Sequence, residues 1–319
     1  CERNNIPIVM ASSNSYVGYT TVALFSLLSN ASCNFFYDIL LLSAENYSKE
    51  NYHLLNEITR KFQNCSIRLI NLSNRIPNKM YIDGHISIET YARLLVPQML
   101  KNYNDVVYLD GDLIINCDVS QLFDTPYPVD AMVSGVPDLD VIGQYYGPEF
   151  SMRYYLDRIL KLDNPTNYLQ AGVLLFHLKN IQRSHNSNVF MEVAAKSKLR
   201  YFDQDVINAI CNKTVHILDY KWNVVNDYNG IRVKNIISNA PTAMLDQYLK
   251  SRKSPGIIHY SGSQKPWNSE QLDMGEYYKK TLSSMRESLL HVPYYKVTNK
   301  KQSKLNHILP CQSFQRELV

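Results

Sequence analysis

The sequence predicts an α/β fold: a mixed, mostly parallel sheet with helices on both faces, followed by a C-terminal tail. Short apolar runs that end in turn residues alternate with segments of helical periodicity, which is typical of parallel strands joined by helices. The 319 residues, 45% apolar and 19% charged, can bury one large core. We therefore expect a domain over residues 1–270 and a tail over residues 271–319.

Strands and helices alternate in the first hundred residues. The clearest helix, at residues 48–62, places Tyr52, Leu55, Ile58 and Phe62 on one face and has Ser48 in position to cap it. The expected elements are strands at 6–12, 36–44 and 66–72, helices at 20–30 and 48–62, and a loop that leads into a helix over 85–100.

The rest of the chain continues this pattern less regularly. In the helix that follows the loop within residues 85–100, we expect Tyr91, Leu94 and Leu95 to point inward. The later elements are strands at 105–110, 131–136 and 171–178, helices at 151–162 and 201–210, and a strand that runs into a loop over 256–267.

Charge and cysteine content exclude several classes of function. A net charge of +4 without an arginine-rich run argues against nucleic acid as a partner. No apolar segment reaches membrane-spanning length, and the N-terminal residues lack the apolar core of a signal peptide. The six cysteines are far apart and form no C-x-x-C pair, which favours free thiols in a reducing compartment. We expect a cytoplasmic protein.

Two carboxylates mark the end of one predicted strand. Asp110 and Asp112 follow the apolar run VVYL, and Gly111 separates them. Ligands of open parallel sheets bind beyond the carboxyl ends of strands, and paired carboxylates there can hold a divalent cation that completes its shell with phosphate oxygens. The D-x-D triplets at 138–140 and 203–205 are typical of solvated turns or helix caps, so this pattern alone is weak.

A remote segment, HYSGSQKPW, completes a coherent site. His259 offers an imidazole ligand, Gly262 allows backbone to approach an anion, and Lys265 supplies a positive charge for phosphate. The alternatives are a core histidine and a surface lysine. Taken together with the two carboxylates, these residues favour a metal and diphosphate site.

Six segments in order resemble family 8 of the retaining glycosyltransferases. They are IVMASSNSY, HISIETYARL, VVYLDGDLI, YLQAGVLLFHL, YFDQDVIN and HYSGSQKPW. The chain is most similar to the bacterial lipopolysaccharide α-galactosyltransferases and more distantly to glycogenin. The resemblance implies a GT-A (Rossmann-like) fold, a UDP-sugar donor, and Mn²⁺ or Mg²⁺.

The resemblance also implies roles for individual residues. Metal ligands would be Asp110, Asp112 and His259, and the donor site would comprise Ala11, Ser13, Tyr16, Arg93, Asp110, Gly111, Asp112, Gln170, Ala171, Asp203, Gln204, Gly262 and Lys265. Tyr16 would stack on uracil, and Arg93 and Asp203 would bind sugar hydroxyls. Ser13, Ser15 and Gln170 stand where relatives often carry Asp or Asn, which predicts an altered fit. The acceptor would lie near His85, Asp138 and Tyr201.

The implied reaction retains the configuration of the transferred sugar. Gln204 would lie beside the anomeric carbon and, being a poor nucleophile, favours attack by the acceptor on the face that UDP leaves. Asp203 is the rival nucleophile, and its structural alternative is a helix N-cap. For Arg93 the structural alternative is a surface arginine.

Two other functions fit parts of the sequence. The segment VVYLDGDLI also resembles the start of a haloacid dehalogenase-type phosphatase, with Asp110 as nucleophile and Asp112 as acid. A catalytically silent module that binds UDP-sugars is the second, and self-glycosylation is a further variant of the transferase.

The tail has a basic and partly aromatic composition. Four lysines and no acid lie between Lys296 and Lys304, with Tyr294 and Tyr295 just before them. This pattern predicts peripheral contact with the anionic inner face of a bacterial plasma membrane, or alternatively a solubilising tail. The acceptor would be a saccharide or glycolipid.

Overall fold

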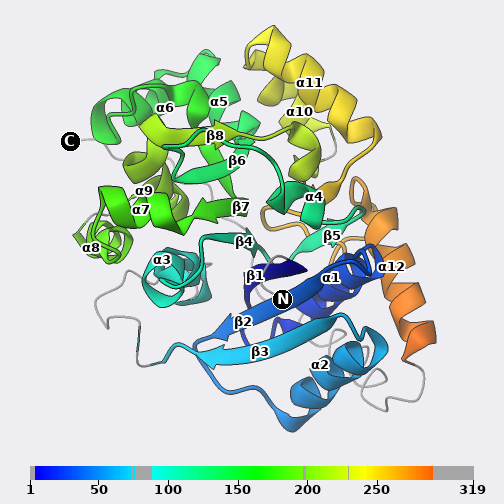
Figure 1. Cartoon of the computed structure of the whole chain (residues 1–319). Helices are drawn as coiled ribbons and strands as arrows, with labels where there is room; N and C mark the ends of the chain where they lie inside the picture. The colour runs from blue at the N-terminus through cyan, green and yellow to red at the C-terminus, as the bar shows by residue number, and fades with distance from the viewer. Residues whose placement is uncertain (1–3, 74, 76–87, 197–198, 229, 290–319) are drawn as a thin grey trace.

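The computed structural model describes residues 4–73, 75, 88–196, 199–228 and 230–289. In this part of the chain a seven-stranded sheet has the order β3-β2-β1-β4-β7-β6-β8, and a three-stranded sheet has the order β5-β10-β9 (Figure 1). The strands are β1 (Asn5–Ala11), β2 (Phe36–Ser43), β3 (Cys65–Asn71), β4 (Asp105–Leu109), β5 (Leu113–Ile115), β6 (Val133–Pro137), β7 (Leu169–His177), β8 (Val215–Ile217), β9 (Val224–Val225) and β10 (Ile257–His259). The predicted mixed α/β fold is confirmed.

One strand of the large sheet runs against the rest. Strands β1, β2, β3 and β4 pair in parallel, and so do β6 and β8, whereas β7 is antiparallel to both β4 and β6. The beginning of β7 therefore lies at the same edge of the sheet as the carboxyl ends of β1 and β4. That edge carries the predicted site.

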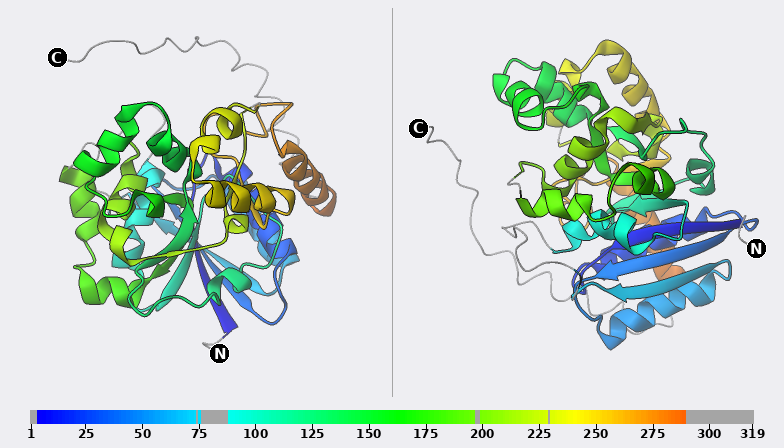
Figure 2. Two further views of the ribbon diagram at one scale, coloured as in Figure 1. Left: turned by 90° about the horizontal axis from the view of Figure 1, so that it is seen from above. Right: turned by 60° about the vertical axis from the view of Figure 1, so that its left-hand side comes forward.

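Alternate strand residues face two hydrophobic cores, one on each side of the sheet. In β4, Val107 and Leu109 belong to the first core, whereas Val106 and Tyr108 belong to the second. The first core is covered by α1 (Val17–Ser29), α2 (Lys49–Lys61) and α12 (Gly275–Ser288). The second is covered by the 3₁₀ helix η2 (Ile88–Leu95) and by α7 (Leu178–Ser184), α8 (Val189–Lys196) and α9 (Phe202–Cys211). Figure 2 shows these layers from two further directions.

The remaining helices surround the smaller sheet and the far end of the large one. They are α4 (Ser120–Phe123), α5 (Leu139–Tyr146), α6 (Phe150–Tyr154), α10 (Ile231–Asn235) and α11 (Thr242–Lys253), whereas α3 (Val96–Met99) directly follows η2 and contacts α7 at the second core.

Helix α2 confirms one detail of its prediction and corrects another. The Ser48 hydroxyl accepts a hydrogen bond from Asn51 N, as expected of an N-cap. Leu55 and Ile58 are buried, but Tyr52 is 43% exposed and Leu54 takes its place in the core. Asn51 is buried as well, so the inward face of the helix is turned away from Tyr52 toward Asn51 and Leu54.

Two predicted helices are less regular than expected. The sequence predicts a loop that leads into one helix over residues 85–100, but the described part forms the 3₁₀ helix η2 and the short α3, with Pro97 in the first turn of α3. Tyr91, Leu94 and Leu95 are nevertheless buried as predicted. The helix predicted at 151–162 divides into α6 and a π-helical turn at Tyr155–Ile159.

Part of the predicted tail packs on the main core. Helix α12 lies against α1 and buries Tyr278 and Met285 in the first core. The boundary at residue 270 remains a prediction, and the lysine-rich residues 296–304 lie outside the described residues.

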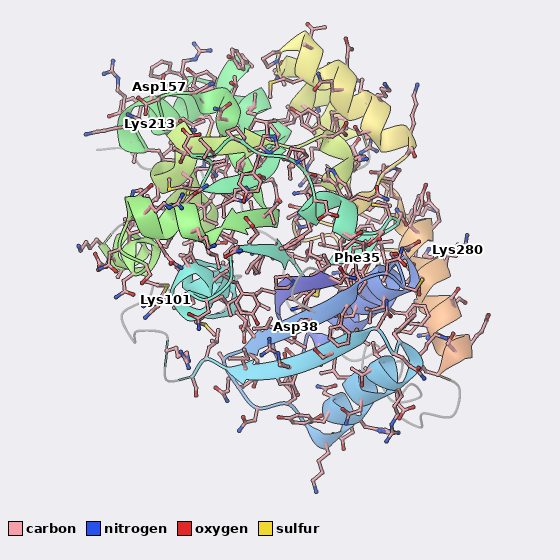
Figure 3. The ribbon with its side chains drawn as sticks, viewed as in Figure 1. Phe35, Asp38, Lys101, Asp157, Lys213 and Lys280 are labelled. Atoms are coloured by element: carbon pink, nitrogen blue, oxygen red, sulfur yellow. The ribbon has the colours of Figure 1, made fainter. Side chains whose placement is uncertain are left out.

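The surface carries charged side chains, and the described cysteines are unpaired. Lys101, Asp157, Lys213 and Lys280 project from the periphery of the molecule (Figure 3). Cys33, Cys65, Cys117 and Cys211 are free thiols. Among the described helices, none combines the length and the apolar character that crossing a bilayer requires.

Candidate active site

The site begins where β4 ends. Asp110 directly follows β4, and its backbone N–H donates to Gly172 O of the antiparallel strand β7 at 2.9 Å. Because β7 runs antiparallel to β4, Gln170, Ala171 and Gly172 at the start of β7 lie beside Asp110 at the end of β4. The sequence alone does not predict this proximity.

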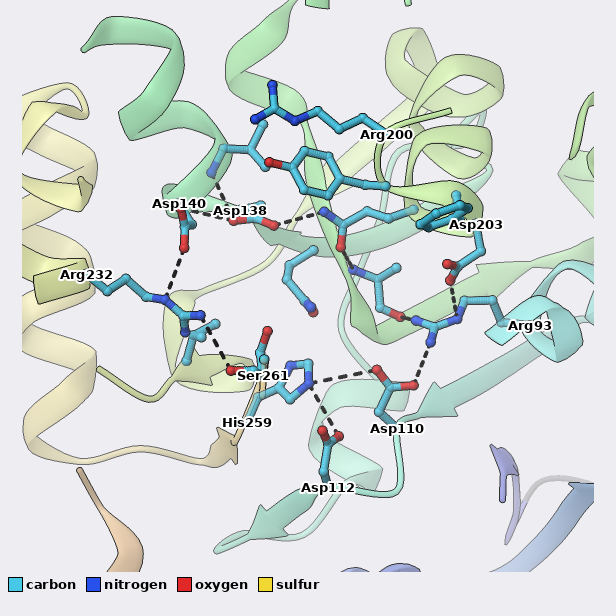
Figure 4. Close-up of a pocket in the computed structure, with 18 of the residues that line it drawn as sticks. Arg93, Asp110, Asp112, Asp138, Asp140, Arg200, Asp203, Arg232, His259 and Ser261 are labelled. Carbon is cyan, nitrogen blue, oxygen red and sulfur yellow. Dashed lines mark hydrogen bonds and ion pairs between the residues drawn. The ribbon is translucent and has the colours of Figure 1, made fainter. Parts of the chain in front are cut away.

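The small sheet brings His259 to the same point. In the antiparallel pair β5 and β10, His259 lies opposite Leu113, and Tyr260 N donates to Asp112 O at 3.1 Å. His259 Nε2 lies 3.4 Å from Asp112 Oδ1 and 3.8 Å from Asp110 Oδ2 (Figure 4). Ligand atoms of Asp110, Asp112 and His259 all lie within 4.8 Å of one another. Two carboxylates and an imidazole at this spacing fit a divalent cation.

Gly172 allows this close approach. A Cβ atom at this position would lie 2.3 Å from His259 Cε1 and 2.9 Å from Asp110 Oδ2. A side chain of any size would therefore displace one of these two residues.

Arg93 connects the metal-binding carboxylates to helix α9. It is buried, its Nη2 lies 2.8 Å from Asp110 Oδ1, and its Nε lies 2.7 Å from Asp203 Oδ2. Its guanidinium also lies over the ring of Tyr108 at 4.7 Å from the ring centre. Burial opposes the charge, but Asp110 and Asp203 outweigh it and raise the pKa of Arg93. The alternative of a surface arginine is wrong.

Lys265 pairs with the second carboxylate. Its Nζ contacts Asp112 Oδ2 and donates to Tyr260 O at 2.6 Å. Burial alone would raise the pKa of Asp112, but neighbouring positive charge, above all the Lys265 ammonium, holds that pKa well below its usual range. Asp112 therefore stays ionised, as a metal ligand must.

Two cavities meet at this cluster. The first, of about 640 Å³, is lined by Ala11, Ser13, Tyr16, Arg93, Asp110, Gly111, Asp112, Gly262 and Lys265 among others. The second, of about 430 Å³, is lined by Arg93, Asp110, Asp112, Asp138, Gln170, Ala171, Tyr201, Asp203, Gln204, His259 and Gly262 among others (Figure 4). Every predicted site residue that the structure describes thus lines at least one cavity, whereas His85 lies outside the described residues.

The first cavity lies between β1 and the loop after β10. Tyr16 precedes α1, and its ring packs edge-on against Trp267 with 5.5 Å between ring centres. Trp267 also stacks on Tyr19 of α1 at 4.0 Å, so the lysine-bearing loop is anchored to α1. Gly262 has a φ of +99°, in the region that favours glycine, and a Cβ atom there would overlap the hydroxyl of Tyr228.

Helix α9 presents Asp203 and Gln204 to the second cavity. Phe202, just before them, has a φ of +45°, a strained value for this residue type. Gln204 Oε1 accepts from Ala171 N at 3.0 Å, and its Nε2 donates to Asp138 Oδ2 at 2.9 Å. The amide is therefore held at both ends beside the start of β7.

The alternative role of Asp203 as a helix cap is wrong. Tyr201 occupies the N-cap position of α9, its own side chain makes no capping hydrogen bond, and its N–H donates to Asp205 Oδ2 at 2.6 Å. Asp203 lies inside the first turn and is buried against Arg93. Burial, only partly offset by Arg93, raises the pKa of Asp203 to about 6.

Two of the predicted acceptor residues, Asp138 and Tyr201, line the second cavity. Asp138 caps α5 by accepting from Asp140 N and Val141 N, so one of its oxygens is engaged structurally. Burial raises the pKa of Asp138. Arg200 lies over the ring of Tyr201, 5.5 Å from the ring centre, and lines the same cavity.

Sequence patterns missed several residues around the two cavities. Arg232 is buried, pairs with Asp140 Oδ2 at 3.0 Å and donates to Ser261 O at 3.4 Å (Figure 4). Asn223 is also buried and contacts His259. Neither residue belongs to a recognisable motif, and only the tertiary structure places them here.

Comparisons with known proteins agree with this geometry. The model of Glycosyl transferase family 8 matches residues 7–271. Lipopolysaccharide 1,2-glucosyltransferase of Escherichia coli is 21% identical over 324 residues, which cover 98% of this chain and 88% of that protein.

Solved structures share the fold. The bifunctional glycosyltransferase WbbM in its apo form superposes with a TM-score of 0.78 and 26% identity over 92% of this chain. The chain spans about half of that protein, because the match covers 51% of its length. The galactosyltransferase LgtC, in complex with donor and acceptor sugar analogues, gives a TM-score of 0.67 at 22% identity and covers 88% of this chain and 96% of its own.

Proposed function

The chain belongs to glycosyl transferase family 8, and on that premise we propose that it is a retaining hexosyltransferase that moves galactose or glucose from a UDP-sugar to a saccharide acceptor. The observation that carries the proposal is the convergence of Asp110, Asp112 and His259 at the junction of two cavities. The first cavity would take the nucleotide and the second the two sugars.

The donor set fits a divalent cation. Asp110, Asp112 and His259 would hold Mn²⁺ or Mg²⁺, and the low pKa of Asp112 keeps that ligand ionised. When bound, the cation would neutralise negative charge that develops on the departing diphosphate. Lys265 lies at the same carboxylate and would add a second positive charge beside the phosphates.

Residues of the first cavity would bind the UDP part of the donor. We propose that Tyr16 stacks on the uracil ring and that Ala11 and Ser13 line the base and the ribose. Gly262, whose backbone conformation is open only to glycine without strain, would let the chain approach the diphosphate.

Residues of the second cavity would position the two sugars. Arg93 holds Asp203 and Asp110 at fixed distances, so it would orient the wall that binds hydroxyls of the donor sugar. Gln204, held by Ala171 N and Asp138, would face the anomeric carbon, and its amide oxygen would stabilise positive charge there. Asp138 and Tyr201 would contact the acceptor.

We favour attack by the acceptor on the face that UDP leaves. Gln204 is barely basic, and Asp203, the rival nucleophile, is engaged by Arg93 and buried. A glycosyl group found covalently on Asp203 by peptide mass spectrometry would overturn this preference.

Metal-dependent UDP release tests the proposal. Purified protein is assayed with UDP-galactose, UDP-glucose and UDP-N-acetylglucosamine in the presence of Mn²⁺ or EDTA. We expect Mn²⁺-dependent turnover, greatest with UDP-galactose and next with UDP-glucose. Asp110→Asn and Asp112→Asn should each reduce it by at least about 10²-fold, because each removes an ionised metal ligand. Asp130→Asn, an exposed carboxylate outside both cavities, is the matched control.

Other outcomes would identify the alternatives. Release of phosphate from p-nitrophenyl phosphate without UDP release would indicate a phosphatase. Tight UDP binding with neither hydrolysis nor transfer would indicate a silent binding module. A ladder of hexose mass increments on the purified protein would indicate self-glycosylation.

Similarity to a named relative suggests the class of acceptor. We propose a lipopolysaccharide or other cell-surface glycan as acceptor, since the similar Escherichia coli protein is named for lipopolysaccharide. We also propose a bacterial cytoplasmic location with peripheral contact at the inner face of the plasma membrane.

A further inference from the structure

We infer that Asn223 and Gln170 are positioning residues that fix the tautomer and the ring orientation of His259, so that its Nε2 lone pair faces the carboxylates. The inference rests on the proposed metal-dependent function. It follows from a chain of hydrogen bonds that begins at a backbone amide, which can only donate.

The chain runs from β7 to β10 through two side-chain amides. Gly172 N donates to Gln170 Oε1 at 2.6 Å, and Asn223 Nδ2 donates to the same oxygen at 2.6 Å. Asn223 Oδ1 lies 3.1 Å from His259 Nδ1. Asn223 and His259 are each only 2% exposed, so solvent does not supply alternative partners.

The polarity of every bond in this chain is determined. Because Gly172 N–H is a donor, the atom of Gln170 that faces it must be the amide oxygen. That oxygen then requires Asn223 to present its NH₂ group, which turns the Asn223 carbonyl toward His259. Rotating either amide would place two donors or two acceptors against each other.

The direction of these hydrogen bonds determines the tautomer of His259. A carbonyl oxygen opposite Nδ1 requires that Nδ1 carry the proton, so in the neutral ring Nε2 carries a lone pair. This lone pair faces Asp112 Oδ1 at 3.4 Å and Asp110 Oδ2 at 3.8 Å. Three acceptors directed at one point repel one another unless a cation lies between them. These hydrogen bonds thus orient His259 so that it can bind a metal ion.

We expect Gln170 to have a second role, in the second cavity. It lines the second cavity, and Gln170 Oε1 is occupied by the two bonds described above. The NH₂ group of Gln170 therefore remains to donate to a hydroxyl in that cavity. The Gln170 side chain would thus contact the donor sugar and, through Asn223, also orient the metal ligand His259.

Mn²⁺ binding without nucleotide tests the inference independently of turnover. Electron paramagnetic resonance of free Mn²⁺ gives the affinity of the full-length protein. We expect Asn223→Leu and Gln170→Leu to bind Mn²⁺ about 10–100-fold more weakly, the usual effect of removing a group that orients a metal ligand. Gln170→Glu should bind nearly as well as wild type, because its carboxylate still accepts from Gly172 N and Asn223 Nδ2.

A matched control separates this role from general stability. Asn208 is a fully buried amide whose described hydrogen bonds go to both backbone groups of Leu169 and to Gln204 O, and none of them involves His259. Asn208→Leu should lower the thermal stability as much as Asn223→Leu does, while leaving the Mn²⁺ affinity unchanged. Gln170→Leu, at a partly exposed position, provides a variant that folds if Asn223→Leu does not.

The tautomer gives a second readout that requires no metal. Long-range ¹H–¹⁵N correlation spectra of the metal-free protein report which nitrogen of His259 carries the proton. We expect the Nδ1-protonated form in wild type and in Gln170→Glu, and a mixture in Asn223→Leu. A neutral His259 ring protonated at Nε2 in wild type, or folded leucine variants that bind Mn²⁺ within twofold of wild type, would overturn the inference. If wild type binds no Mn²⁺, the proposed function fails, while the tautomer still decides the role of Asn223.

Discussion

Replacing Gly172 with alanine is the smallest change that should disable the metal site. The added methyl group would lie 2.3 Å from His259 Cε1, 2.7 Å from His259 Nδ1 and 2.9 Å from Asp110 Oδ2. Non-bonded carbon atoms in contact are about 3.5–4.0 Å apart, so the imidazole must retreat by at least about 1 Å.

The expected loss follows from the tolerance of metal coordination. Ligand distances in a working site vary by only about 0.2 Å, so a ring displaced by about 1 Å no longer completes the coordination shell. A misplacement of this size can also cost about 10²-fold in rate. We therefore expect Gly172→Ala to weaken Mn²⁺ binding at least tenfold and to lower Mn²⁺-dependent UDP release by about 10²-fold.

The assay combines Mn²⁺ titration with UDP release and thermal unfolding. Gly18→Ala is the matched control, because a Cβ atom at Gly18 in α1 meets nothing within 4 Å. That variant should keep wild-type Mn²⁺ affinity and gain about 0.5–1 kcal/mol of stability, as glycine-to-alanine changes within helices usually do. A folded Gly172→Ala protein with wild-type Mn²⁺ affinity would refute the steric argument.

Three further predictions address stability and location. Arg93→Met should lower the free energy of unfolding by about 3–5 kcal/mol, because it leaves Asp110 and Asp203 without their buried partner, and urea titration measures the loss. Burial and then a neighbouring imidazole lower the pKa of His216 below 6.5, so the unfolded chain binds this proton first as the pH falls. Stability should therefore decline below pH 6.5, and His216→Gln should reduce that decline in urea titrations; an unchanged slope would contradict it. Deleting residues 290–319 should reduce flotation with anionic liposomes, and equal, negligible flotation of both proteins would remove the membrane contact.

The fold was predictable from the sequence because its determinants are local. Buried strands such as β1 and β4 are recognisable in the sequence as apolar runs, and helix α2 is recognisable as an amphipathic segment with a capping residue. The position of Asp110 at the end of β4 follows from the same pattern. The exceptions are Tyr52, which is exposed although the apolar periodicity places it inward, and the helix after residue 150, which contains a π-helical turn.

The candidate site was predictable only in part. The chemical types of its ligands could be read from motifs, because carboxylates, an imidazole and a lysine near glycine indicate a metal and an anion. The burial of Arg93 and the contact of Asn223 with His259 could not be predicted from the sequence, because neither depends on neighbouring residues in the chain.

Short-range periodicity and side-chain chemistry specify the order of the elements, the strand end that carries two acids, and the residue types able to hold a cation, so these features were predictable from the amino-acid sequence. The antiparallel direction of β7 and the pairing of β10 with β5, which places His259 opposite Leu113, became evident only in the folded molecule. These pairings join segments remote in the chain, and their register depends on packing across the whole domain. Through them Gly172 and His259 reach Asp110 and Asp112.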